Sequence, residues 1–278
     1  MLAILLGLVS SASWGVADFL GGVASRRAPV LAVVALSQAT GLVLAGILLA
    51  ILRPDVPPAG DLALGALAGL CGLVGLVAFY RGMAIGSISI IAPISALGAL
   101  VPLVADLARG LSPGGLALTG MVVALAGASL AARAPGPASR AGAGLALIAA
   151  LGFGAFFALL GEVASDGSAL WALASARAGS APLAVIAAVL VVGAAGPAAL
   201  HGATLVMVVV SGVLDASANL LFALGTGHGL VSVVAVLGSL YPVVTIALAG
   251  ALLGERLSRL QALGAALALA GVVMIAAG

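Results

Sequence analysis

The chain has 278 residues, of which 64% are hydrophobic and 6% are charged. A soluble domain is nearer half apolar and a quarter charged, so this composition excludes a soluble globule and predicts an all-α membrane protein surrounded mostly by lipid. The net charge is +2 and the ten basic residues are dispersed arginines. Without a basic cluster, we expect no nucleic-acid partner.

Ten apolar segments, each separated from the next by polar, Pro or Gly residues, predict ten transmembrane helices. The clearest breaks are "RPDVPPAGD" (53–61) and "RAPGPASRAG" (133–142). The runs do not alternate polar and apolar residues as the strands of a membrane barrel would. In chain order we expect spans near 2–23, 30–52, 62–80, 84–107, 114–132, 142–163, 168–193, 202–222, 230–253 and 258–277.

The two halves of the chain resemble each other. The run "LGALVP" (97–102) recurs as "LGSLYP" (237–242). The pair Gly120 and Gly127 recurs as Gly264 and Gly271, with the same spacing of seven. These matches predict a duplication of five helices, with a first repeat over 1–132, a loop over 133–141 and a second repeat over 142–278. An odd number of spans per repeat inverts the second half, and inverted repeats are a transporter architecture with the substrate site near the midplane.

A charge at mid-bilayer costs roughly 2.5–3.5 kcal/mol on insertion scales and usually faces a cavity or a partner, and we expect four charged residues to lie at such depth. They are Asp18, Glu162, Arg177 and Asp215. Two helical stripes extend this set, because Asp215 shares a face with Asn219 and Asp18 shares one with Trp14. Polar or aromatic residues at comparable depth complete the candidate substrate-binding or coupling site: Trp14, Asp18, Gln38, Tyr80, Glu162, Arg177, Asp215, Asn219 and Tyr241.

Two interpretations of these charges stand side by side. In the functional one, Arg177 holds an anionic group, and Asp18, Glu162 or Asp215 holds an amine or carries a coupling proton. In the structural one, Arg177 pairs with Asp215 or Glu162 and stabilises the bundle. For Asp18 the question is also one of depth, because it faces either a central cavity or the membrane edge near the arginines at 26 and 27.

Several motifs together are similar to a known family. The run "ALLGERLSRLQALGAALALAGVVMI" (251–275), the preceding "LGSLYPVVT", the first span "SASWGVADFLGGVASRR" and the arginine-bearing "SARAGSAPL" resemble EamA-type transporters of the drug/metabolite transporter superfamily. The resemblance covers nearly the whole chain. It gives the "GERLS" turn, with Gly254, Glu255 and Arg256, a structural role. The corresponding turn of the first repeat, "ARGLSPG" (108–114), lacks the glutamate.

The resemblance implies a secondary transporter, either an exporter or an exchanger, that spans the cytoplasmic membrane many times. Its partners would be a small polar metabolite, an amino acid or a drug-like solute, together with the lipid bilayer and protons as a candidate coupling ion. The sequence leaves open whether it is a monomer or a homodimer. We expect no cofactor and no metal, because the two histidines lie far apart in the sequence.

Two rival classes are an intramembrane enzyme and a channel or structural membrane subunit. "GLSPG" (110–114) matches the Gly-x-Ser-x-Gly nucleophile pattern, but that pattern requires a strand before the serine and a helix after it. Here it falls in a predicted turn between two membrane helices. The inverted repeat with intramembrane charges favours alternating access over a channel.

Overall fold

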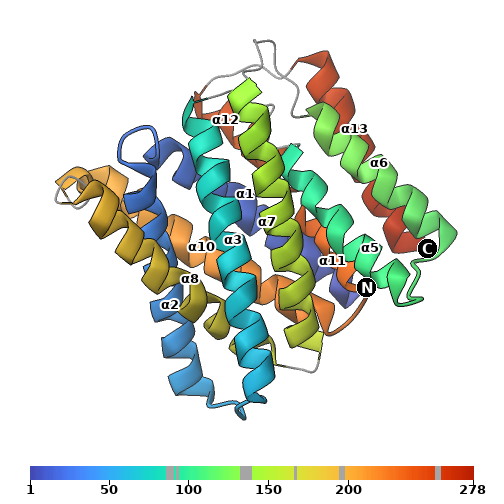
Figure 1. Ribbon diagram of the computed structural model, residues 1–278. Coiled ribbons are helices and arrows are strands. Elements are labelled where there is room, and N and C mark those ends of the chain that lie inside the picture. Colours follow the sequence, from blue (N-terminus) through green and yellow to red (C-terminus); the bar gives the residue numbers. More distant parts are fainter. Residues whose placement is uncertain (86–90, 92–93, 132–139, 166–167, 194–197, 254–257) are drawn as a thin grey trace.

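The fold is all-helical. The computed structural model describes residues 1–85, 91, 94–131, 140–165, 168–193, 198–253 and 258–278 (Figure 1). The elements of the first half are α1 (Leu2–Ala24), α2 (Val30–Leu52), α3 (Ala59–Ile85), η1 (Leu97–Ala99), α5 (Leu100–Ala108) and α6 (Gly115–Ala131). Those of the second half are α7 (Arg140–Ser165), α8 (Ala169–Val192), α10 (Gly202–Thr226), α11 (Val231–Gly238), α12 (Tyr241–Leu253) and α13 (Arg259–Ala277).

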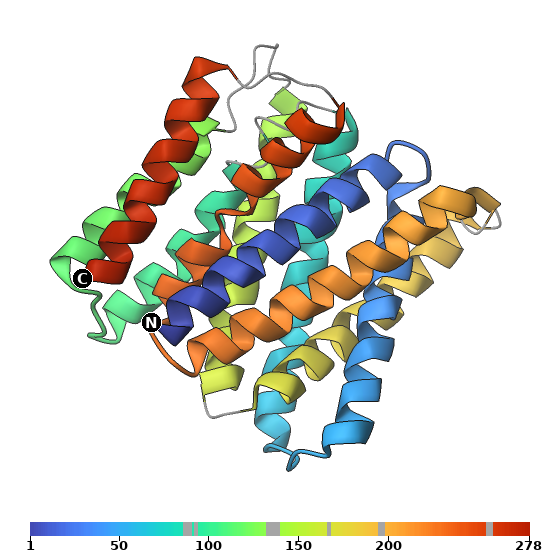
Figure 2. The ribbon, with the colours of Figure 1, turned by 180° about the vertical axis from the view of Figure 1, so that it is seen from behind.

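The helices follow the predicted spans closely. Among the described residues, six helices are long and apolar enough to cross a membrane, namely α1, α2, α3, α7, α8 and α10. Four shorter apolar helices occupy the other predicted spans, at Ile94–Ala108, Gly115–Leu130, Val231–Thr245 and Ala262–Ile275. The chain thus forms a bundle of ten apolar spans, and its two termini lie at the same end (Figures 1 and 2).

The fourth and ninth spans depart from the expectation of continuous helices. The ninth is divided into α11 and α12, and the fourth passes from a helical turn at 94–96 through the 3₁₀ turn η1 into α5. Pro102 and Pro242 have no backbone N–H, so the carbonyls of Gly98 and Gly238, four residues earlier, gain no α-helical hydrogen bond. The interruption therefore falls inside the repeated run "LG-x-L-x-P" in both halves, at 97–102 and 237–242.

The packing of the helices follows an inverted symmetry that exchanges spans five apart. In the first half, α1 packs along α10 and against α11 and α12. The equivalent helix of the second half, α7, packs along α3 and against η1 and α5. The α2 and α8 helices pack on each other, as do α6 and α13, and Figure 1 shows the last two side by side at the edge of the bundle.

Close contact between α6 and α13 depends on the repeated glycines. A Cβ added at Gly127 would lie 2.3 Å from the Ala268 nitrogen and 2.7 Å from the Gly264 oxygen. One added at Gly271 would lie 2.4 Å from the Ala124 nitrogen. The Gly-x6-Gly spacing thus lets two backbones approach directly, as small residues do in membrane helix pairs.

Candidate functional site

A cavity of about 60 Å³ lies between the two halves of the bundle. Helices α1, α2 and α3 of the first half and α7, α8, α10 and α12 of the second contribute to its wall. Seven of the nine residues that the sequence predicted for a site line it: Trp14, Asp18, Gln38, Arg177, Asp215, Asn219 and Tyr241.

A buried ion pair crosses one wall of the cavity. One terminal nitrogen of Arg177 on α8 lies 2.6 Å from Oδ2 of Asp215 on α10, and the two side chains are 6% and 15% exposed. The other terminal nitrogen donates to Oε1 of Gln38 on α2. The same Gln38 oxygen accepts a hydrogen bond of 2.9 Å from the Ser180 hydroxyl. The guanidinium is therefore held by acceptors from both repeats.

The second oxygen of Asp215 is also occupied. Nε1 of Trp14 on α1 donates to its Oδ1 at 3.1 Å. Asp215 therefore links α1 to α8, with an indole donor on one oxygen and a guanidinium on the other. Ser211, one turn earlier on α10, instead donates to the backbone oxygen of Ala17 at 2.8 Å and serves the packing of α10 on α1.

Asp18 faces the cavity and not the membrane edge. Its side chain lines the cavity wall and is buried. The hydroxyl of Tyr80 on α3 hydrogen-bonds to it, and Tyr80 also contacts Ser211. Tyr80 itself is fully buried behind Asp18 and does not line the cavity. Its position is that of a support for the carboxylate.

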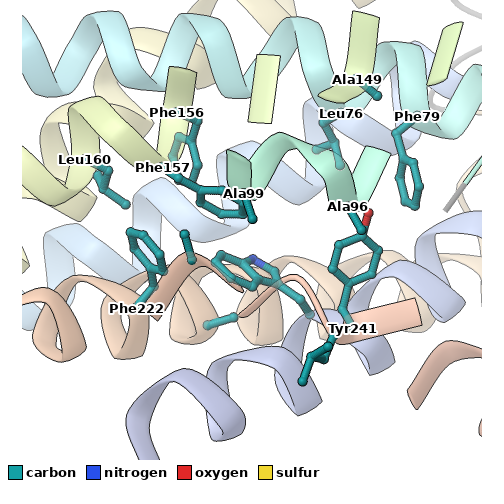
Figure 3. Close-up of a cluster of buried hydrophobic side chains, with 14 of the residues drawn as sticks. Leu76, Phe79, Ala96, Ala99, Ala149, Phe156, Phe157, Leu160, Phe222 and Tyr241 are labelled. Carbon is teal, nitrogen blue, oxygen red and sulfur yellow. The ribbon is translucent and has the colours of Figure 1, made fainter. Parts of the chain in front are cut away.

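Aromatic rings form much of the remaining wall. Trp14 packs against Phe157 with ring centroids 5.4 Å apart, and Phe157 packs against Phe222 at 5.1 Å. Tyr241, at the start of α12, meets Phe79 edge-on at 5.9 Å, and its hydroxyl lies 2.6 Å from the Ser95 hydroxyl. Figure 3 shows Phe156, Phe157 and Phe222 on one side of this cluster and Phe79 with Tyr241 on the other. The break between α11 and α12 thus brings Tyr241 to the cavity.

Glu162 lies outside the cavity, unlike the other charges predicted for the site. It pairs with Arg109 at the end of α5, and the two side chains are 46% and 54% exposed. The hydrogen bond and the charge of Glu162 raise the pKa of Arg109. The other predicted residues of structural interest, Gly254, Glu255 and Arg256, fall outside the described residues.

Asp106 is a buried carboxylate that the sequence reasoning missed. It lies near the end of α5, only 4% exposed, and accepts a hydrogen bond of 2.9 Å from the backbone N–H of Ser232 in the first turn of α11. The signal was present in the sequence, because Asp106 falls inside the predicted span 84–107.

Inverted packing, two interrupted helices and charged residues around a central cavity define a membrane transporter architecture. The chain belongs to the EamA-like transporter family, whose model matches residues 1–133 and 140–277. Family membership makes the protein a multi-pass integral membrane transporter of a small-molecule substrate, and not an enzyme. The "GLSPG" run accordingly joins α5 to α6.

Comparisons with individual proteins add the fold alone. No curated protein matches the chain. Among the solved structures that match, one crystal structure has a TM-score of 0.78 and 20% sequence identity, over 98% of this chain and 95% of that one.

Proposed function

We propose that the protein is a secondary transporter, an exporter or exchanger, that carries a small polar metabolite by alternating access through the cavity between its repeats. The observation that carries the proposal is the Arg177–Asp215 pair. It is buried, it is joined to α1 and α2 through Trp14 and Gln38, and it lines the space where the two repeats meet. Charged residues at this depth are costly unless a cavity or partner uses them.

The size of the cavity supports alternating access over a continuous channel. A volume of about 60 Å³ holds a few water molecules, whereas small-molecule pockets measure roughly 300–1,000 Å³. A solute enters only if the helices around the cavity separate. The break between α11 and α12 lies beside the cavity, which Tyr241 lines, and residues at the ends of such elements are where hinge movements are usually absorbed.

Exchange in reconstituted vesicles tests the proposal. Vesicles containing the full chain are loaded with unlabelled amino acids or organic amines, one at a time, and uptake of the same labelled solute is followed. A carrier shows uptake that an internal solute accelerates, and Arg177→Ala or Asp215→Asn should abolish it. Ser217→Ala is the matched control on α10, because the Ser217 hydroxyl binds the Val213 oxygen of its own helix.

Two results contradict the proposal. One is uptake no faster than in protein-free vesicles for every solute of the panel. The other is unchanged exchange in both the Arg177→Ala and the Asp215→Asn proteins.

A further inference from the structure

Arg177 has little capacity left for an anionic ligand. Its two terminal nitrogens are engaged by Asp215 and Gln38. Its Nε is buried with no hydrogen-bond partner and lies beside α2, where a Cβ added at Gly41 would come within 3.0 Å of it. A carboxylate entering the cavity would have to displace Asp215, which a second donor, Trp14, also holds.

Asp18 is the charge that remains without a counter-ion. Among the described residues, the charged side chains lining the cavity are Asp18, Arg177 and Asp215. Ionised, they sum to +1 − 2 = −1. Arg177 pairs with Asp215, whereas the hydrogen-bond partner of Asp18 is the neutral Tyr80 hydroxyl. An excess charge in a low-dielectric site is unfavourable until a cation neutralises it.

The walls near Asp18 suit an organic cation. Trp14 lies one turn before Asp18 on α1, and Tyr241 is close enough to interact electrostatically with the Asp18 carboxylate. Phe156 and Phe157 line the same cavity. Aromatic faces attract ammonium groups, and they do so more strongly when the site is dry.

From this charge balance we infer that the solute carries a positively charged amine or ammonium group, which binds at Asp18 against the aromatic wall. The inference rests on the proposed function and narrows its substrate class. It also reverses the role expected for Arg177, which neutralises Asp215 and shapes the wall without binding a substrate anion. A proton on Asp18 takes the place of the solute when the cavity is empty.

Three probes of matched shape test the inference. Tetramethylammonium is a permanent cation, tert-butanol is neutral and pivalate is an anion. The chain has two tryptophans, so Trp171→Phe leaves Trp14 as the sole indole and a reporter inside the cavity. The purified full chain in lipid nanodiscs should show a saturable change of Trp14 emission with tetramethylammonium, at least tenfold tighter than with either other probe.

Variants assign the preference to Asp18. Asp18→Asn should reduce tetramethylammonium affinity at least tenfold. Asp18→Glu keeps the charge and should retain the preference for the cation, which would show that the position tolerates a substitution. Asp55→Asn, in the exposed loop between α2 and α3, is the matched control. Preference for pivalate, no saturable response to any probe, or equal affinity in Asp18→Asn would overturn the inference.

The two failures are distinguishable. If exchange in vesicles requires Arg177 and Asp215 but the probes show no cation preference, only the substrate class is wrong. If exchange does not require them, the proposed function itself fails, whatever the probes show.

Discussion

The Asp106 carboxylate on α5 accepts a 2.9 Å hydrogen bond from the backbone N–H of Ser232 at the start of α11. The bond joins the interrupted spans of the two repeats, one to the other. The first N–H groups of a helix have no partner within the helix, and a carboxylate there both accepts a hydrogen bond and interacts well with the helix dipole. Asp106 therefore caps α11 from a neighbouring helix.

Removal of this cap should destabilise the bundle. We expect Asp106→Ala to lower the free energy of unfolding by about 1–2 kcal/mol, the usual cost of a lost cap. Asp106→Asn, which keeps an oxygen acceptor but not the charge, should lose less. Thermal unfolding of the purified chain measures both, with Asp55→Asn as the control. A melting temperature for Asp106→Ala equal to that of the wild type would show that the cap is unimportant.

The contribution of the Arg177–Asp215 pair to stability should be separable from its contribution to transport. Arg177→Met alone leaves Asp215 buried without its cation, which costs about 3–5 kcal/mol where buried pairs have been broken. Arg177→Met combined with Asp215→Leu removes both charges and should recover most of that stability. Exchange should stay absent in the double variant. A double variant that exchanges solute normally would show that the pair is structural only.

Glu162 should be dispensable. Its pair with Arg109 is about half exposed, and exposed pairs contribute about 0–1 kcal/mol. We therefore expect Glu162→Gln to change the melting temperature little and to leave the exchange rate near that of the wild type. A loss of exchange comparable to that of Asp215→Asn would place Glu162 in the transport pathway after all.

The contrast between Asp18 and Glu162 shows what the sequence can and cannot predict. Both lie near the end of the first span of their repeat, so their positions in the sequence do not distinguish them. Hydropathy and the polar, Pro and Gly residues between the apolar runs were sufficient to predict ten helices. In lipid, each span must satisfy its own backbone hydrogen bonds, which a helix does. The rotation of a helix about its axis depends on its neighbours. Only packing reveals that Asp18 faces the cavity while Glu162 faces Arg109.

The interrupted spans mark a similar limit. The prolines at 102 and 242 belong to the repeated run, yet hydropathy alone predicted a continuous helix at each, because the residues on both sides are apolar. Polar partners were harder still to predict. That Gln38 and Asp215 would converge on one guanidinium depends on the contacts of α2, α8 and α10, which are distant in the sequence.

The α6–α13 contact should tolerate no side chain at Gly127. Gly127→Ala places a methyl group 2.3 Å from a backbone nitrogen of α13, so the two helices must separate and the melting temperature should fall. Gly46→Ala is the matched control, because an added Cβ there meets nothing within 4 Å. Alanine favours a helix over glycine by about 0.5–1 kcal/mol, so the control should be neutral or slightly stabilising. Equal melting temperatures for the two variants would contradict the packing.

Acid should weaken the binding of tetramethylammonium, because a proton and the cation compete for the same carboxylate. The groups around Asp18 come from several helices: Tyr80 from α3, Asp215 from α10 and Tyr241 from α12, with Arg177 of α8 beyond Asp215. Asp215 is paired with Arg177, whereas Asp18, among the described residues, has only the Tyr80 hydroxyl as its hydrogen-bond partner, so Asp18 is the carboxylate at which a proton and the cation compete. Below its titration point, each further pH unit should weaken binding by up to tenfold, the limit for one competing proton.

Binding titrations from neutral to acidic pH in the Trp171→Phe protein measure the slope, and binding by Asp18→Asn should be weak and independent of pH. Wild-type affinity that does not change with pH would mean that no proton replaces the cation at Asp18.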